Sequence, residues 1–126
     1  LSEGDDGSII ACVCVVAEAV NAYDTLARKG VGAIVLNVHT LKPLDHQAII
    51  NAAAETGRVV TAEEHRLAGG LGGAVAELLA LEHPTPMRMI RMPDEFAVVG
   101  PTLQVRERYG MSSEAIVDAC TQLLER

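Results

Sequence analysis

The residues best suited to chemistry in this chain are Glu63, Glu64 and His65, which directly follow a short apolar run at residues 58–62. A carboxylate and an imidazole are the groups that most often act as general acid and base. Consecutive side chains on an extended segment point to opposite faces, so Glu64 and His65 need not act together. The alternative is that these polar groups at a strand end bond nearby backbone or a partner protein. We favour the alternative, because adjacency in sequence is not a catalytic arrangement.

A glycine cluster at residues 69–73, GGLGG, stands just before a helical pattern at residues 74–81. It fails as a dinucleotide fingerprint, because Val75 occupies the place of the third glycine. Two interpretations stay open. The helix start could bind a small anion with Arg66 nearby, or the glycines could form a tight turn against a neighbouring domain or subunit. The candidate interface or anion loop comprises Glu64, His65, Arg66, Gly69, Gly70, Leu71, Gly72 and Gly73.

The histidines and cysteines do not predict a metal centre. The four histidines have no recognised ligand spacing, and Cys12 and Cys14 lack the second pair that a structural zinc site needs. We therefore predict no metal ligand and interpret the cysteines as buried structural residues. The histidines are His39, His46, His65 and His83, and the third cysteine is Cys120.

Two further motifs are assigned to local structure. The GDDG sequence at residues 4–7 resembles part of a metal–diphosphate motif, but it precedes a strand rather than closing one, so we interpret it as a solvated tail or turn. Ser112 or Ser113 is a helix cap rather than a nucleophile, because no glycine elbow flanks the pair.

Composition excludes several classes of protein. The 126 residues are 49% hydrophobic, which is enough for one domain with a sizeable core. The net charge of −7 argues against general nucleic-acid binding, which needs a basic surface. No apolar stretch reaches the roughly 18 residues that a membrane helix needs. Three cysteines, an odd number in apolar contexts, fit a reducing cytoplasm rather than a disulfide framework.

Strand and helix patterns alternate along the chain. Both faces of the first strand are apolar, as in a strand covered on both sides. Alternation of this kind predicts an α/β fold with a mostly parallel sheet and helices on both faces. We expect residues 1–7 to be a tail or turn left from a preceding domain and residues 8–126 to form one domain. The predicted strands are 8–16, 33–37, 58–62 and 87–92, and the predicted helices are 17–29, 46–56, 71–81 and 114–125, with a short helix at 102–108.

Some helix details follow from the same patterns. Asp45 is a predicted N-cap, and Gly57 is predicted to close the second helix. In the first helix Val20, Leu26 and Ala27 are expected to face inward. The inner stripe of the last helix is expected to contain Ile116, Val117, Cys120, Leu123 and Leu124.

Five segments, taken in order, resemble the transketolase C-terminal domain. Residues 37–45, NVHTLKPLD, are similar to the family's DLRTxKPLD segment, and residues 56–65 end in its EEH. Residues 69–77 match its GGLGxAVAE turn into a helix. The closing PDxF and YGL segments correspond to residues 93–96 and 109–111. The resemblance covers the chain from about Ser8 to Leu124.

The resemblance implies a three-layer α/β/α domain whose five-stranded sheet is mostly parallel, with one antiparallel edge strand. The fifth strand is expected at residues 97–99 or in the N-terminal segment. One departure stands out: the family continues its first strand as ATGS, whereas this chain reads ACVC at residues 11–14. Because Val13 cannot freely replace a glycine at positive φ, either the strand runs on or the contacts at that edge differ.

For function, the resemblance implies a non-catalytic domain of a thiamine-diphosphate-dependent enzyme that moves ketol units between sugar phosphates. Thiamine diphosphate and magnesium belong to the whole enzyme, between a pyrimidine-binding and a diphosphate-binding domain, and no cofactor ligand is expected in this chain. The implied partners are those two domains and a second copy in a homodimer. The alternatives are the C-terminal domain of a 2-oxo acid dehydrogenase β subunit or of deoxyxylulose-phosphate synthase, and a small-anion-binding regulatory domain.

Overall fold

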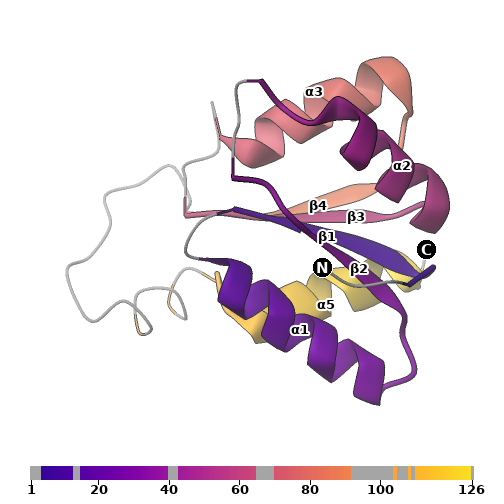
Figure 1. Ribbon diagram of the computed structural model, residues 1–126. Helices are drawn as coiled ribbons and strands as arrows, with labels where there is room; N and C mark the ends of the chain where they lie inside the picture. The colour runs from indigo at the N-terminus through magenta and orange to yellow at the C-terminus, as the bar shows by residue number, and fades with distance from the viewer. Residues whose placement is uncertain are drawn as a thin grey trace.

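The described part of the protein folds into three layers, a parallel sheet with helices on both faces (Figure 1). A computed structural model describes residues 4–12, 15–39, 43–64, 70–91, 104, 108 and 110–125. One face of the sheet carries α1 (Val16–Arg28) and α5 (Ser113–Leu124). The other face carries α2 (His46–Thr56) and α3 (Leu71–Glu82). The predicted α/β/α class is confirmed.

Four strands form the sheet in the order β2-β1-β3-β4, and every neighbouring pair is parallel. In the register Ile9 lies opposite both Val35 and Val60. The fifth, antiparallel strand is not among the described residues; residues 97–99 lie outside them, and in the N-terminal segment Asp5 and Asp6 form bends. The strands are β1 (Gly7–Ala11), β2 (Ala33–Asn37), β3 (Val59–Ala62) and β4 (Met87–Ile90).

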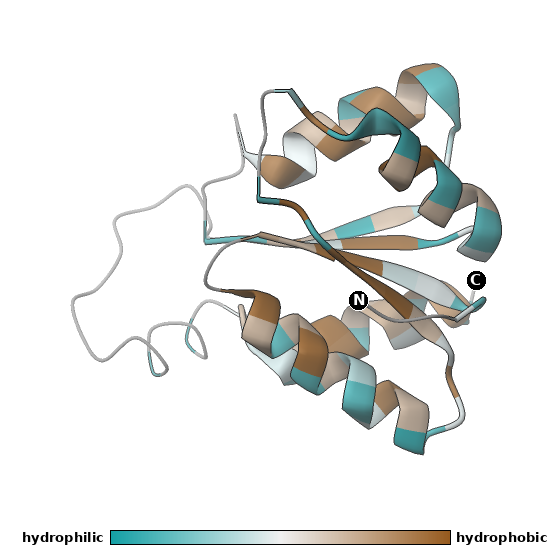
Figure 2. Ribbon diagram, viewed as in Figure 1, coloured by the Kyte–Doolittle hydropathy of each residue, from teal (hydrophilic) through white to brown (hydrophobic). Residues whose placement is uncertain are grey.

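The sheet separates two hydrophobic cores. Ile9 and Ala11 of β1 belong to the core beneath α1 and α5, whereas Ile10 belongs to the core beneath α2 and α3. This split follows from the alternation of side chains along a strand. Figure 2 shows the same division, with hydrophobic residues on the strands and on the helix sides that face them. A strand covered on both sides must be apolar on both faces, as the sequence predicts for β1.

Most predicted elements are confirmed, but the first strand is shorter than predicted. The second strand and the second helix begin and end at the predicted residues. The prediction that the first strand runs from residue 8 to residue 16 is wrong, because β1 ends at Ala11 and α1 begins at Val16. An apolar run cannot distinguish a buried strand from a buried helix start by periodicity alone. Val15 is fully buried, but as the residue that precedes α1.

The predicted caps are present. The carboxylate of Asp45 accepts a hydrogen bond from the Ala48 amide at 3.1 Å, and the Ser112 hydroxyl accepts one from the Ala115 amide at 3.3 Å. Gly57 ends α2 with φ 68°, a left-handed conformation in which glycine avoids the Cβ clash.

The inner face of α1 differs from the prediction. Ala19, Ala22 and Leu26 are buried, whereas Val20 is 38% exposed and Ala27 is exposed. Ala19, Ala22 and Leu26 are three and four residues apart and therefore share one face of the helix, which is the face turned to the core. In α5 the predicted stripe is buried except for Leu124, which is half-buried.

Buried hydroxyl groups fasten α2 to the sheet. The hydroxyl oxygens of Ser8 and Thr56 lie 2.8 Å apart, and each lies 3.0 Å from the carbonyl oxygen of Ala52, so one hydroxyl donates to the other while the second donates to a carbonyl. Because Ser8 and Thr56 are almost fully buried, these bonds avoid the cost of an unsatisfied polar group.

Two leucines of α3 provide a matched test of the inner core. Leu79 is 1% exposed and Leu81 is 77% exposed. We expect Leu79→Ala to lower the free energy of unfolding by about 2–5 kcal/mol, because it leaves a cavity. Leu81→Ala should change it by no more than about 0.5 kcal/mol. Urea denaturation of both variants measures this, and equal losses would contradict the assigned orientation of α3.

Candidate functional site

The carboxyl edge of the sheet is built around Glu63, the residue after β3. Its backbone amide donates to the carbonyl of Ile90 at 3.0 Å, which continues the pairing with β4 by one residue. The side chain is only 2% exposed, although carboxylates are rarely buried without a partner. A carboxylate buried to this extent requires hydrogen-bond donors around it.

The Glu63 carboxylate binds the first turn of α3. Oε1 accepts a hydrogen bond from the Leu71 amide at 2.7 Å, and Oε2 accepts one from the Gly72 amide. These amides belong to the group of N–H donors that have no partner inside the helix. A negative charge here also faces the positive end of the helix dipole. Glu63 thus acts as a helix cap supplied from the preceding strand.

Close packing at Gly72 makes this contact possible. A Cβ atom there would lie 3.0 Å from the sulfur of Met89 and 3.1 Å from both Glu63 Oε2 and the hydroxyl of Thr61. Gly72 lets the first turn of α3 approach β3 and β4 closely. At Gly73 a Cβ atom would meet nothing within 4 Å. The requirement for glycine in the cluster is thus steric at Gly72 and absent at Gly73.

The structure describes five of the eight candidate loop residues. Glu64 is exposed, and Gly70, which precedes α3, is buried. Leu71 and Gly72 are buried and Gly73 is half-buried. His65, Arg66 and Gly69 lie outside the described residues. The proposed interface or anion loop remains a prediction.

The hydrogen bonds of Glu63 argue against an anion bound at the start of α3. The amides of Leu71 and Gly72 already donate to Glu63. A phosphate at these two amides would have to displace a carboxylate that is almost fully buried. The Glu63 carboxylate therefore bonds nearby backbone amides, which is the interpretation that the sequence analysis favoured for this residue.

The other candidate side chains are dispersed. His39 follows β2, His46 begins α2, and His83 follows α3. Among the described residues no three His, Cys, Asp or Glu side chains lie close enough together to hold a metal ion. Within that same part of the chain, no helix is long and apolar enough to cross a membrane.

Cys12 and Cys120 are not in disulfides. Cys120 is buried, and burial raises the pKa of its thiol to about 12. Because the thiolate is the reactive form, Cys120 is a poor nucleophile near neutral pH. Cys14 lies outside the described residues.

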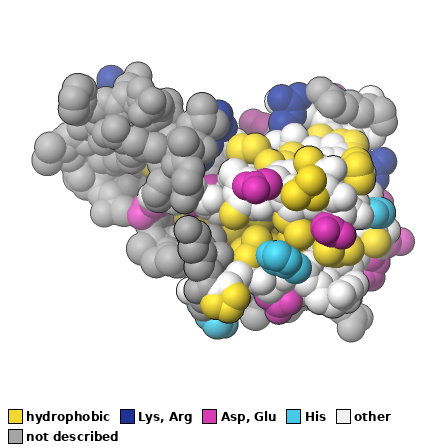
Figure 3. All heavy atoms as spheres, turned by 90° about the horizontal axis from the view of Figure 1, so that it is seen from above, with side chains coloured by type: hydrophobic (Ala, Val, Ile, Leu, Met, Phe, Trp, Pro, Cys, Tyr) yellow, Lys and Arg dark blue, Asp and Glu magenta, His cyan; other side chains and the backbone are white. Residues whose placement is uncertain are grey.

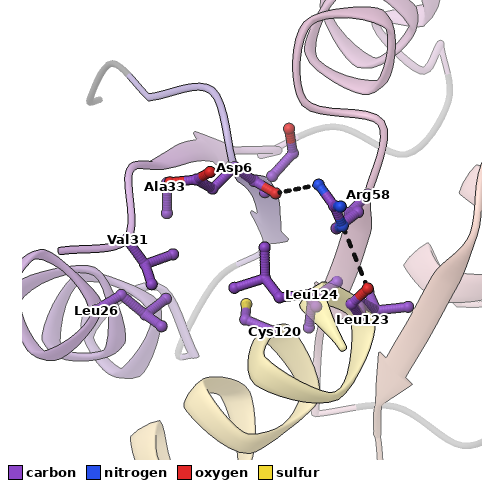
Figure 4. Close-up of a pocket in the computed structure, with 11 residues that line it drawn as sticks. Asp6, Leu26, Val31, Ala33, Arg58, Cys120, Leu123 and Leu124 are labelled. Carbon is purple, nitrogen blue, oxygen red and sulfur yellow. Dashed lines mark hydrogen bonds between the residues drawn. The ribbon is translucent and has the colours of Figure 1, made fainter. Parts of the chain in front are cut away.

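At the amino ends of the strands, Asp6 and Arg58 hydrogen-bond segments that are distant in the sequence. Asp6 Oδ2 accepts a hydrogen bond from the Gly32 amide at 2.7 Å. The Arg58 guanidinium donates to the carbonyls of Asp6 and Leu123, each at 3.2 Å (Figure 4). The sequence analysis missed this bridge, because carbonyl acceptors leave no trace in a sequence pattern. Asp6 thus lies in a bend before β1, where its carboxylate bonds backbone.

The small cavity beside this bridge is not a substrate site. It holds about 10 Å³ of free space, roughly what one water molecule needs. Leu26, Val31, Cys120 and Leu123 supply much of its apolar wall (Figure 4). The polar side chains around it, those of Asp6, Ser8 and Arg58, are hydrogen-bonded to backbone groups of the domain.

Comparison with known proteins identifies the family. The profile of the family described as "Transketolase, C-terminal domain" matches residues 1–116. The chain belongs to the transketolase C-terminal domain family. The sequence resemblance is therefore confirmed at the level of the family.

Relatives of this transketolase C-terminal domain include both subunits and longer enzymes. The chain is 45% identical over 126 residues to the 6-deoxy-6-sulfo-D-fructose transketolase subunit SqwH of Clostridium sp. (strain MSTE9), covering 100% of this chain and 39% of that protein. It is also 45% identical over 126 residues to 1-deoxy-D-xylulose-5-phosphate synthase 1 of Geobacter sulfurreducens, covering 98% and 20% respectively. The chain therefore spans well under half the length of these relatives.

A solved structure shares the fold. It is titled "Split gene transketolase, inactive beta4 tetramer", with a TM-score of 0.91 and 37% identity. The match covers 98% of this chain and 40% of that one. The arrangement of four parallel strands between two helix layers is thus that of a transketolase C-terminal domain.

The two glycines at the start of α3 give a matched pair of variants. We expect Gly72→Ala to lower the free energy of unfolding by about 1–3 kcal/mol, because the new methyl group overpacks against Met89 and Glu63. Gly73→Ala should raise it by up to about 1 kcal/mol, because alanine is the better helix former. Chemical denaturation compares them, and equal effects would rule out the close contact at Gly72.

Neighbouring glutamates test the helix cap. Glu63→Gln keeps the shape of the side chain, but removes its charge and places an NH₂ group against one of two amide donors. We expect it to lower the free energy of unfolding by about 1–3 kcal/mol. The exposed Glu64→Gln should stay within about 0.5 kcal/mol of the parent chain. Amide hydrogen exchange at Leu71 and Gly72 should accelerate only in Glu63→Gln; unchanged exchange there would refute the cap.

Proposed function

We propose that this chain is the non-catalytic C-terminal domain of a thiamine-diphosphate-dependent transketolase, with a role in domain packing and in assembly of a homodimer. The observation that supports the proposal most is that the Glu63 carboxylate occupies the amide donors of Leu71 and Gly72 at the start of α3. The feature that most suggests an anion site in the sequence is thus used within the domain. In the whole enzyme, ketol transfer between sugar phosphates takes place in other domains.

Thiamine diphosphate does not fit the described residues. Its diphosphate would need amide donors or cations, together with ligands for a divalent metal. The buried carboxylate of Glu63 repels such a group at α3, and no described cluster of acidic or histidine side chains is suited to a metal. We therefore assign the cofactor and magnesium to the pyrimidine-binding and diphosphate-binding domains, which are the proposed partners of this chain.

The lengths of the relatives agree with a supporting role. The chain corresponds to 39% of the SqwH subunit and to 40% of the solved split-gene transketolase chain. Most of each relative therefore lies outside the region that this chain matches. A domain of this kind contributes a surface to an assembly, and we place that assembly in the cytoplasm because the cysteine pattern suits a reducing compartment.

A second candidate is the C-terminal domain of 1-deoxy-D-xylulose-5-phosphate synthase. The identity to the Geobacter sulfurreducens synthase, 45%, equals that to SqwH. The product made by the whole enzyme separates the two candidates. Formation of 1-deoxy-D-xylulose 5-phosphate supports the synthase, and exchange of a two-carbon unit between sugars supports the transketolase.

The 126-residue chain alone should be inactive. We expect no ketol transfer when it is supplied with thiamine diphosphate, magnesium and a ketose phosphate donor, and no heat of thiamine diphosphate binding in calorimetry.

The control is a grafted subunit, in which this chain replaces the matched region of SqwH. The grafted subunit should assemble in analytical ultracentrifugation, whereas SqwH without the region should not. Turnover by the chain alone would overturn the proposal.

A further inference from the structure

The helix α3 is more apolar than its position in the fold requires. Its sequence, LGGAVAELLALE, carries only two charged residues, Glu77 and Glu82. A helix that is apolar on all sides is normally buried on all sides. In this structure α3 buries one side against the sheet, and Leu81 on its other side is 77% exposed. Among the described residues, the only other large hydrophobic side chain that is exposed is Val20, at 38%.

Two hollows extend this apolar face beyond α3. One, of about 400 Å³, lies between the start of α2 and the outer side of α3, and its wall includes Leu44, Leu78 and Leu81. The other, of about 460 Å³, lies on the far side of Pro43 and Leu44, against the end of β2. Figure 3 looks onto this side of the molecule and shows hydrophobic side chains gathered there, with acidic and histidine side chains among them.

Within α2 and α3, the two helices that form this face, the side chains of fixed charge are all acidic. Neither α2 nor α3 contains a lysine or an arginine. Glu77 and Glu82 border the first hollow and are exposed, and Glu55 of α2 is exposed as well. Pairing with a second copy through a two-fold axis would set the same acidic face against itself. Charge complementarity therefore favours a different occupant, with apolar side chains at its centre and lysine or arginine at its rim.

We infer that the face formed by Leu44, Glu77, Leu78, Leu81 and Glu82 is the docking surface for the rest of the enzyme. The occupant is polypeptide from the part of a transketolase subunit that this chain does not span, and it presents basic residues to Glu77 and Glu82. This inference rests on the proposed function, because it names the surface through which the domain packs. Leu81 is the central contact, since it is the most exposed apolar side chain on the face.

Hydroxyl-radical footprinting read by mass spectrometry tests the surface. The 126-residue chain is compared with the grafted subunit, and the measured quantity is the oxidation rate of Leu81. We expect a several-fold loss of oxidation at Leu81 on grafting. Val20 on α1, on the opposite face of the sheet, is the internal control and should stay reactive. Full oxidation of Leu81 in the grafted subunit would overturn the inference.

Two pairs of charge reversals test the chemistry of the occupant. In the grafted subunit, Glu77→Lys with Glu82→Lys should restore much of the oxidation at Leu81. The matched control is Glu114→Lys with Asp118→Lys, which makes the same change in charge at exposed residues of α5. Circular dichroism establishes that each variant is folded. Protection of Leu81 that survives the α3 reversals would refute a basic occupant.

Other outcomes separate this inference from the proposed function. If no segment of the chain is protected in the grafted subunit, the proposed packing role itself fails. If protection occurs only at other segments, the role stands and this surface is wrong. If Leu81 in the free chain becomes protected as its concentration rises, and ultracentrifugation shows dimers, the occupant is a second copy and the inference is overturned.

Discussion

The contact between Glu63 and the first turn of α3 is the interaction on which the carboxyl edge of this domain depends. A buried carboxylate is tolerable only when hydrogen bonds replace its lost hydration. Two amides of α3 supply those bonds, and Gly72 removes the methyl group that would keep the helix away from Thr61 and Met89. The Glu63 carboxylate thus holds the start of α3 against the end of β3. Gly72, which has no side chain, allows the helix to pack closely on β3 and β4.

This arrangement gives a loop with the composition of a ligand site a structural use within the domain. In open α/β sheets ligands gather at the carboxyl ends of the strands, where helix amides point outward. Here the protein's own carboxylate fills the position of the ligand at α3. The opposite edge is closed by Arg58, which joins the N-terminal turn to the end of α5. Among the described residues, the outer side of α3 carries the most exposed large hydrophobic side chain, Leu81.

Much of the fold could be predicted because local signals agreed with each other. Asp45 and Gly57 predicted the two ends of α2, and the apolar run at residues 33–36 predicted β2, both with the bounds that the structure has. The first strand was predicted too long, because Val15 and Val16 are as apolar in a buried helix start as they would be in a strand. Val20 was predicted to face inward because it is hydrophobic, but Ala19 and Ala22 are the buried residues of that part of α1.

The sequence alone determined the α/β class, the order of the elements and the family, since these depend on periodicity, caps and motif spacing along the chain. It also identified the strand end and the glycine cluster as special. Only the tertiary structure decided that Glu63 serves α3, that Gly72 rather than Gly73 must be glycine, and that Leu81 faces outward. The physical reason is that hydrogen bonds to backbone amides and steric limits between distant segments depend on distances in space, which residue types do not record.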